Sequence, residues 1–289
     1  DRSLFMSDAL QLIEAGLSSG SKAQKKIGKY LLENYATAAG MTAAKLAATV
    51  GTSESTVVRY AADLGYRGYP ELQAALKESI RGTLTSLQRM ELSGATTGEE
   101  AFYRSMRADM ENIKKTMAET DVHIFDLVAE KLISARRIYI IGARSATALA
   151  MFLEFYLTQL FDDVRLVQTV AGGEVFDRML SVDAEDVVIG ISFPRYSRRT
   201  LDALDFSKKK GAYVVGITDS DYSPLASLAD AAVYAHNEND CFVDSLVAPM
   251  AVLNAIIAAV TAKRPEESVA RLTEMEQIWD EYNVYKTNK

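Results

Sequence analysis

Two stretches of the sequence carry side chains suited to binding an anion. Gly142-Ala143-Arg144-Ser145 follows one apolar, β-branched run, and SFPRYSRRT, residues 192–200, follows another. Each stretch leads into helical spacing, so its hydroxyls and backbone N–H groups lie where a helix dipole favours negative charge. Arginine adds bidentate donors for phosphate or carboxylate. The residues expected to bind an anionic small molecule are Gly142, Ala143, Arg144, Ser145, Ser192, Arg195, Tyr196, Ser197, Thr200 and Glu238.

The elements that must position these loops alternate between strand and helix patterns from Arg136 onward. The expected strands are 137–141, 164–168, 186–192, 212–218 and 231–235, and the expected helices are 145–161, 174–181, 198–210, 223–229 and 243–262. This alternation is typical of βαβ units and a parallel sheet. In such sheets a ligand binds beyond the carboxyl ends of the strands, where the strand order reverses. The sequence therefore predicts an α/β domain, a five-stranded parallel αβα sandwich, with both loops at that edge.

A second set of candidate residues lies in the stretch 43–62, AAKLAATVGTSESTVVRYAA. Ala47 is small where two helices would cross, and Gly51 suits a turn that needs a positive φ. Thr42 can cap the first helix, and Thr52 or Ser53 the second. This spacing predicts a helix-turn-helix within an all-α N-terminal domain. The residues expected to contact double-stranded DNA are Thr52, Ser53, Glu54, Ser55, Thr56, Arg59, Tyr60, Lys22 and Arg67, with Arg59 suited to guanine edges.

Charge is distributed unevenly along the chain. Over 289 residues the net charge is −7, but residues 1–82 hold ten Lys and Arg against eight Asp and Glu. Residues 83–289 hold 22 against 31. Phosphate contacts dominate DNA affinity, so a domain with a net charge of +2 binds weakly by itself. We therefore expect two copies on one duplex, supplied by a homodimer or homotetramer.

Composition excludes several classes of protein. A single cysteine excludes an internal disulfide, and the two histidines lie far apart, so neither a metal site nor another cofactor is expected. No apolar run is long enough to span a bilayer, and no signal-peptide pattern opens the sequence. These features predict a cytoplasmic protein without a membrane partner.

The expected domain organisation has four parts. They are a helix-turn-helix domain over 1–82, a linker and connecting helix over 83–118, the α/β domain over 119–264, and a C-terminal helix over 265–289. The small, polar stretch 93–99 indicates the linker. The apolar stripe on the last helix, between Val269 and Tyr282, is a candidate dimer seam.

The order of these parts resembles the RpiR/MurR family of bacterial transcription regulators, whose second domain has the flavodoxin-like SIS (sugar isomerase) fold. The resemblance rests on TVVRYAADLGYRGYPEL (56–72), IYIIGARSA (138–146) and VVIGISFPRYSRRT (187–200), and it covers roughly residues 5–262. It implies a repressor or activator of sugar-catabolism genes whose DNA binding responds to a phosphosugar or a related metabolite. By position, Gly142, Arg144 and Ser145 match the family's first ligand loop. The hydroxyl positions of its second loop match Ser192, Ser197 and Thr200.

The chain departs from the family pattern in the second loop. The family's usual loop has Ser-Gly where this chain has Pro194-Arg195. The change removes a phosphate-binding hydroxyl and a flexible glycine, and it adds a guanidinium that can hold a carboxylate or a phosphate. The departure implies that the effector is a sugar acid, or a phosphate held differently from the usual one.

Two other functions remain open on the sequence alone. A phosphosugar isomerase with a helical extension would need a positioned acid and base, for which Glu174, His236 and Glu238 are the candidates. A sugar-binding regulator could instead dock its helical domain onto a partner protein. The residues favour a DNA-binding regulator in which the effector changes the relative placement of two DNA-binding domains, with residues 93–118 as the moving element.

Overall fold

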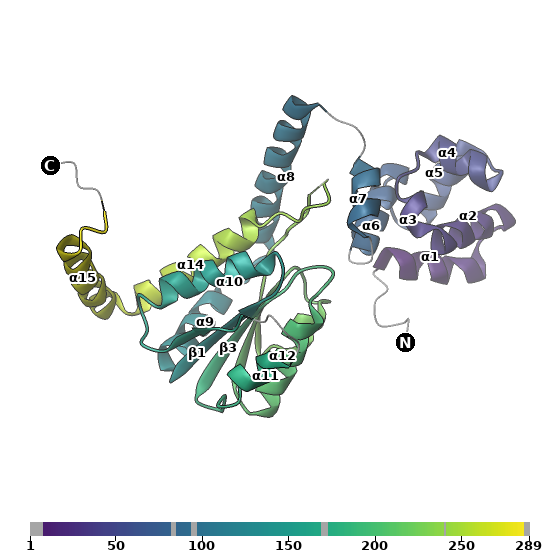
Figure 1. The fold of residues 1–289 in the computed structure, drawn as a ribbon. Coiled ribbons are helices and arrows are strands. Elements are labelled where there is room, and N and C mark those ends of the chain that lie inside the picture. Colours follow the sequence, from purple (N-terminus) through teal and green to yellow (C-terminus); the bar gives the residue numbers. More distant parts are fainter. Residues whose placement is uncertain (1–7, 82–84, 94–96, 169–172, 240, 286–289) are drawn as a thin grey trace. The chain divides into compact units, whose positions relative to one another are not determined.

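The computed structural model describes residues 8–81, 85–93, 97–168, 173–239 and 241–285 (Figure 1). The chain divides into two compact units. The first comprises Asp1–Ala95 with Asp240–Phe242, and the second comprises Thr96–Asn239 with Val243–Lys289. Each unit is described by itself below.

The described part of the first unit is helical. Its helices are α1 (Asp8–Ser19), α2 (Lys22–Glu33), α3 (Tyr35–Ala38), α4 (Ala43–Val50), α5 (Glu54–Asp63), α6 (Tyr69–Arg81) and α7 (Ser86–Ser93). The core gathers one apolar face from each of several helices, as helical periodicity requires. Its fully buried side chains include Ile13, Ile27, Leu31, Leu46, Val57, Leu72 and Leu76.

Helices α4 and α5 form the expected helix-turn-helix. The N–H of Lys45 donates to Thr42 Oγ1 at 3.2 Å, which caps α4. At the end of α4, Gly51 has φ of +74°, a left-handed conformation that a side chain would oppose. Of the two cap candidates for α5 the structure selects Ser53, whose Oγ accepts from the N–H of Thr56 at 3.3 Å. The predicted turn and caps are confirmed.

The second unit contains a parallel sheet between helices. Two helices precede the sheet, α8 (Gly98–Glu119) and α9 (His123–Ser134). The strands are β1 (Arg137–Gly142), β2 (Val164–Leu166), β3 (Asp186–Ile191), β4 (Tyr213–Thr218) and β5 (Ala231–Tyr234). The remaining helices are α10 (Ala146–Leu157), α11 (Glu174–Arg178), α12 (Arg198–Lys209), α13 (Pro224–Leu228), α14 (Val247–Lys263) and α15 (Pro265–Glu281). Every strand pairing is parallel, in the order β2-β1-β3-β4-β5, and this confirms the predicted α/β sandwich.

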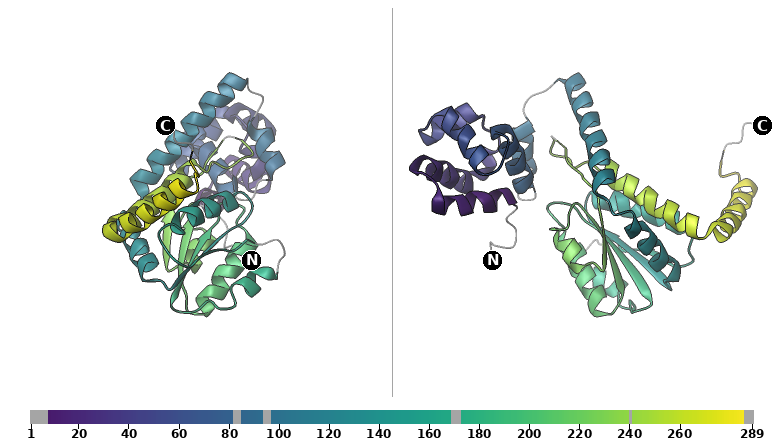
Figure 2. Two further views of the ribbon diagram at one scale, coloured as in Figure 1. Left: turned by 60° about the vertical axis from the view of Figure 1, so that its left-hand side comes forward. Right: turned by 180° about the vertical axis from the view of Figure 1, so that it is seen from behind.

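Alternate side chains of the strands supply two separate cores, because successive residues of a strand point to opposite faces. Ile138, Ile140 and Ile189 lie in the core beneath α9, α10 and α14. Tyr139 and Val188 lie in the opposite core, with α11, α12 and α13. Figure 1 shows the two helical layers on either side of the sheet, and Figure 2 shows them again from behind.

The register of β1 and β3 places the two candidate loops beside each other. Gly142, the last residue of β1, pairs with Ile191, the last residue of β3. Strand order reverses between these two strands, since β2 lies outside β1 and β4 outside β3. The loops after β1 and β3 therefore leave the sheet at the position where this topology binds ligands.

Among the described residues, no single helix combines the length and the apolar composition needed to cross a membrane. Helices α14 and α15, which meet at a bend of 107°, satisfy both criteria when they are taken together.

Candidate functional site

The loop after β1 is held close to the start of α10. A Cβ on Gly142 would lie 2.6 Å from the carbonyl oxygen of Ala146, so only glycine allows this approach. The Thr147 hydroxyl donates to the Gly142 carbonyl at 3.0 Å. Arg144 has φ of +58°, and its side chain is exposed beside that of Ser145. The loop thus presents a guanidinium and a hydroxyl immediately before a helix N-terminus.

The loop after β3 folds around its own serines. The backbone N–H of Ser197 donates to the buried Ser192 Oγ at 3.0 Å. The N–H of Thr200 donates to Ser197 Oγ at 3.4 Å, which caps α12. Arg195, between the serines, has φ of +68° and an exposed side chain, and the Tyr196 hydroxyl donates to Asp219 at 2.8 Å.

Thr200 carries the most informative polar atom of this loop. Its side chain is fully buried in the first turn of α12, and no described group lies within hydrogen-bonding distance of its Oγ1. A buried hydroxyl without a partner is unfavourable, and such groups are rare in folded proteins. A ligand oxygen at this helix N-terminus would satisfy it.

Glu238 and His236 follow β5 at the same edge, but both are held by α8. Glu238 forms an ion pair with Lys115 at 3.1 Å, and its backbone N–H and C=O both bond the Asn112 side chain, at 3.2 and 2.7 Å. His236 Nε2 lies 2.7 Å from a carboxylate oxygen of Glu119. Hydrogen bonding to Glu238 and Glu119 raises the pKa of His236. These groups attach α8 to the end of β5, and within the described part of the chain neither His236 nor Glu238 forms a hydrogen bond or an ion pair with Glu174.

The sequence did not reveal the polar face of α8 that makes these contacts. Asn112 is only 1% exposed, and Asp109 accepts a hydrogen bond from the Ser245 hydroxyl at 2.6 Å. The partners lie more than 120 residues further along the chain, so spacing within α8 could not identify them. The one available signal was that polar residues occupy positions where an amphipathic helix would bury apolar ones.

On the helix-turn-helix, most of the predicted DNA-contacting residues are accessible. Glu54, Ser55 and Arg59 are exposed along α5, Ser53 is exposed at its cap, and Thr52 and Thr56 are half-buried. The hydroxyls of Ser55 and Thr56 lie 2.9 and 2.7 Å from Ser53 Oγ. Lys22 is exposed at the start of α2. The exposed guanidinium of Arg67 pairs with Glu71 at 3.1 Å.

Tyr60 was wrongly assigned to the DNA-contacting face. Its side chain is 3% exposed, because it lies one helical turn after the buried Val57 and so points to the same side of α5. A Cβ on Gly28 would lie 2.7 Å from the Tyr60 hydroxyl, so the ring packs against α2. Burial raises the pKa of Tyr60 to about 12. Tyr60 belongs to the core of the first unit.

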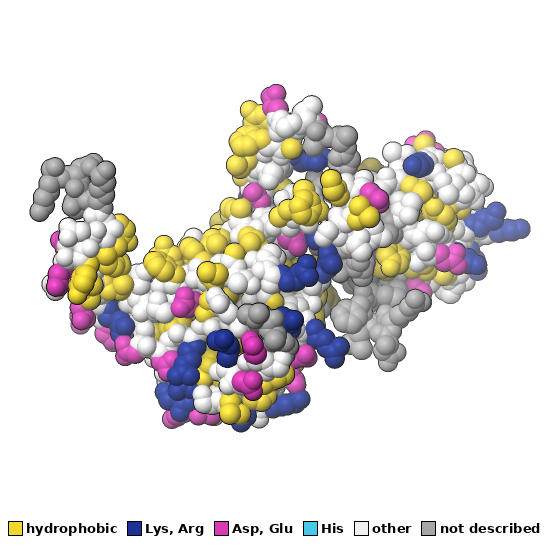
Figure 3. Space-filling view, viewed as in Figure 1, with side chains coloured by type: hydrophobic (Ala, Val, Ile, Leu, Met, Phe, Trp, Pro, Cys, Tyr) yellow, Lys and Arg dark blue, Asp and Glu magenta, His cyan; other side chains and the backbone are white. Residues whose placement is uncertain are grey.

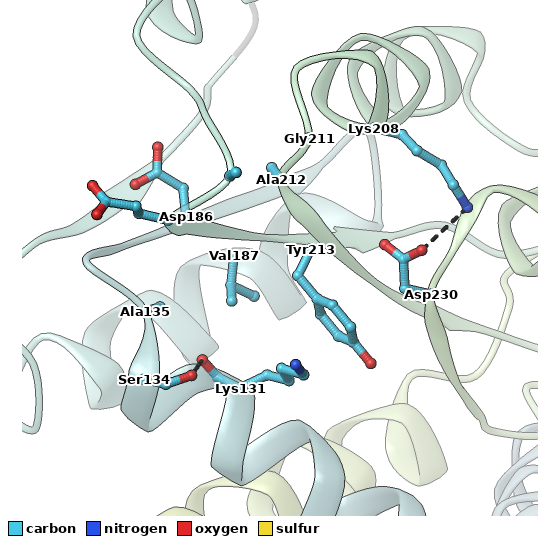
Figure 4. Close-up of a pocket in the computed structure, with 12 residues that line it drawn as sticks. Lys131, Ser134, Ala135, Asp186, Val187, Lys208, Gly211, Ala212, Tyr213 and Asp230 are labelled. Atoms are coloured by element: carbon cyan, nitrogen blue, oxygen red, sulfur yellow. Dashed lines mark hydrogen bonds and ion pairs between the residues drawn. The ribbon is translucent and has the colours of Figure 1, made fainter.

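A hollow of about 490 Å³ lies at the opposite edge of the sheet, where β3, β4 and β5 begin (Figure 4). Several charged groups that line it have partners within the chain. Lys208 lies 3.3 Å from Asp230, and the buried Asp186 accepts from Arg136 at 2.9 Å. Lys131 lies 4.7 Å from the centre of the Tyr213 ring. This hollow is therefore a separate place from the loops after β1 and β3, whose arginines and hydroxyls lie at the carboxyl edge of the sheet.

Both parts of the chain match known protein families. Residues 7–82 match the helix-turn-helix domain of the rpiR family, and residues 131–259 match the SIS domain. An HTH-type transcriptional regulator of Caldanaerobacter subterraneus is 25% identical over 287 residues, which cover 94% of this chain and 97% of the relative. The chain belongs to the RpiR family.

Further relatives of this RpiR-family protein agree with that assignment. The HTH-type transcriptional regulator HexR of Pseudomonas aeruginosa is 24% identical over 266 residues, covering 90% of this chain and 91% of HexR. The sugar isomerase domain of an RpiR transcription factor from Sphaerobacter thermophilus is 27% identical, with a TM-score of 0.58, over 61% of this chain and 97% of that domain. The NanR protein of Vibrio vulnificus, solved in complex with ManNAc-6P, has the same fold, with a TM-score of 0.59 at 20% identity over 95% of this chain and 98% of NanR.

These relatives decide between the functions that the sequence left open. The two relatives that align with this chain over nearly the full length of both sequences are helix-turn-helix transcriptional regulators. The RpiR-family protein is therefore a DNA-binding transcriptional regulator and not a phosphosugar isomerase with a helical extension.

Proposed function

We propose that this regulator binds operator DNA through α5 and is controlled by an anionic sugar derivative held where β1 and β3 end. The observation that carries the proposal is the buried, unpartnered Oγ1 of Thr200 in the first turn of α12. It lies in a loop where Ser192 and Ser197 also present hydroxyls, at the strand-order reversal. Hydroxyl donors at a helix N-terminus favour phosphate or carboxylate oxygens. NanR, which shares the fold, was solved with a sugar phosphate, in agreement with this ligand class.

The proposed DNA contacts use the exposed face of α5. Arg59 would bond guanine edges in the major groove, while Ser55 and the capping Ser53 would contact bases or phosphates. Lys22 and Arg67 would contact phosphates. Since residues 1–82 have a net charge of only +2, useful affinity needs a second copy of the domain on the same duplex.

Helix α8 offers a surface for pairing two copies of the chain. Five of its apolar side chains recur every three or four residues and so form one stripe. They are Phe102, Met106, Met110, Ile113 and Met117, each at least 39% exposed. Figure 3 shows apolar side chains gathered on this helix. Read in the reverse direction the stripe has nearly the same spacing, which suits two antiparallel copies of α8 related by a twofold axis.

The same helix provides a route from the effector to the DNA. Its inner face is fixed to the segment after β5 by Asn112, Lys115 and Thr116, whose hydroxyl accepts the His236 N–H at 2.9 Å. α8 begins at Gly98, shortly after the boundary between the two units. An effector that shifts the carboxyl edge of the sheet would therefore shift α8 and, through the chain, the placement of the DNA-binding domains.

Replacing Thr200 with valine tests the proposed effector site. Valine has nearly the same shape and removes the unpartnered hydroxyl, so the second unit should be equally stable or more stable by about 1 kcal/mol. Affinity for a sugar phosphate should fall by about 10- to 100-fold, because a hydrogen bond to a charged group contributes about 1.5–3 kcal/mol. Thermal unfolding measures the stability. Calorimetric titration with a panel of pentose and hexose phosphates measures the affinity.

Ser207→Ala is the matched control on the same helix. Ser207 is also fully buried, but its hydroxyl donates to the Ala203 carbonyl at 2.7 Å and lies at the far end of α12. This variant should lose stability and keep its ligand affinity. If Thr200→Val binds sugar phosphates as tightly as the parent chain, the effector is not at this loop.

A further inference from the structure

We propose that Val58 reads thymine in the major groove, through contact between its side chain and the C5-methyl group of the base. This inference rests on the proposed placement of α5 in the major groove, and it adds a second base contact to that of Arg59. Part of the operator sequence would then be recognised through a methyl group and not through a hydrogen bond.

Val58 is an exposed apolar side chain on a helix whose other large apolar residues are buried. It is 42% exposed, whereas Val57 and Tyr60 are 0% and 3% exposed. The core of the first unit is built from the buried face of α5, and Val58 lies outside that core. Valine is also less favourable than alanine, lysine or glutamate at an exposed helix position, because its branched Cβ restricts the side chain. Core packing and helix propensity therefore give no reason for valine at this position.

Val58 lies in the exposed stripe of α5 that would face the bases. Ser55 precedes it by three residues and Ala62 follows it by four, so the three side chains share one face of the helix. Arg59, the next residue, is exposed beside it. Helical side chains lean toward the N-terminus, and Ala62 is too small to cover Val58 from the following turn. Val58 is also in the N-terminal half of α5, the part of a recognition helix that contacts base edges.

The chemistry of the major groove identifies the base. Among the groups that distinguish the bases there, the C5-methyl group of thymine is the only apolar one, and the others are hydrogen-bond donors or acceptors. An exposed valine beside a donor or an acceptor would displace water without replacing its hydrogen bond, which is unfavourable. A helix rises by about 1.5 Å per residue and DNA by about 3.4 Å per base pair, so we expect the thymine within about two base pairs of the guanine that Arg59 contacts.

The test replaces single thymines of the operator with deoxyuridine, which lacks only the C5-methyl group. The operator is the duplex that the full chain selects from a random pool, and fluorescence anisotropy measures its affinity. We expect one thymine in each half-site whose replacement weakens binding by the parent protein about three- to fivefold, because a buried methyl group contributes about that much to affinity. Replacement of the other thymines should have a smaller effect.

Val58→Ala identifies the side chain that makes the contact. Alanine has a higher helix propensity than valine, so the variant should fold, which thermal unfolding checks. We expect it to bind the thymine operator at least about threefold more weakly than the parent, and to change its affinity by less than about 1.5-fold when that thymine is replaced. Leu12→Ala is the control, because Leu12 is 44% exposed but lies on α1. That variant should keep both the affinity and the dependence on the methyl group.

The outcomes separate this inference from the function on which it rests. If no thymine replacement weakens binding while Arg59→Ala does, α5 is the recognition helix but Val58 does not read thymine. Equal sensitivity of Val58→Ala and the parent to the same replacement would also overturn the inference, since another residue would then contact the methyl group. A loss that is the same on both operators, with a lower oligomer mass in sedimentation, would place Val58 against a second copy of the chain. If Arg59→Ala has no effect either, the proposed DNA contacts themselves fail.

Discussion

Replacing Arg59 with alanine is expected to weaken operator binding by about 10- to 100-fold for each helix-turn-helix that engages the duplex, because a bidentate arginine–guanine contact contributes about 1–3 kcal/mol. Arg59 is exposed on α5, and the core side chains Val57 and Ala61 point away from it. The loss of affinity should depend on the DNA sequence, so the variant should discriminate less between bases at one position of the operator. Fluorescence anisotropy at fixed salt, on a duplex that the parent protein selects from a random pool, measures both effects.

Lys29→Ala is the matched control for Arg59→Ala. It removes one positive charge from the same domain, at a side chain on α2 that is 71% exposed and paired with Glu33. We expect a change of less than about threefold in operator affinity, since a single surface charge has a weak and screened effect. If Arg59→Ala and Lys29→Ala have the same affinity for the operator, and the same affinity for random DNA, α5 is not the recognition helix.

A methyl group at Gly142 should disrupt the effector site and destabilise the second unit. The Cβ of alanine would lie 2.6 Å from the Ala146 carbonyl oxygen and 3.2 Å from the Ala150 Cβ, so α10 must move away from β1. Overpacking of this kind costs about 1–3 kcal/mol. The unfolding transition of the second unit should shift to lower temperature, and sugar phosphate binding should weaken because the loop before α10 moves with the helix.

Gly98→Ala provides the comparison for Gly142→Ala. Among the described residues, no atom beyond the chain neighbours of Gly98 and the backbone of its own helix lies within 4 Å of a Cβ there, and the residue is in the first turn of α8. Alanine there should leave stability unchanged or raise it by up to about 1 kcal/mol, because it has higher helix propensity than glycine. Equal stability of the two variants would contradict the close approach of α10 to β1.

Much of the fold could be predicted from the sequence, because several residue types have specific local conformational roles. Gly51 and the capping hydroxyls of Thr42 and Ser53 have conformational roles that their residue types reveal. The apolar strands could be recognised because the sheet is buried on both faces, which leaves near-continuous runs such as the one ending at Ile191. Helix α9 was not predicted, although its buried Val128, Ala129 and Leu132 follow helical spacing.

Contacts between distant segments explain what the sequence could not predict about the site. Tyr60 has a polar hydroxyl that suits DNA, and only the packing of α2 against α5 shows that it is buried. Glu238 was expected to contact the ligand, but its carboxylate forms an ion pair with Lys115. Only the packing of α8 against the end of β5 reveals that contact. The left-handed backbone of Arg144 and Arg195 could not be predicted either, since arginine does not favour that conformation.

The most direct test of the central claim is the operator affinity of the full chain with and without a sugar phosphate that calorimetry shows to be bound. We expect the ligand to change that affinity by at least about fivefold, the lower end of typical allosteric coupling. Asn112→Ala, which removes both side-chain bonds to the Glu238 backbone, should still bind the ligand but lose most of that change. If the parent chain has the same operator affinity without the sugar phosphate and when saturated with it, the SIS domain does not control DNA binding.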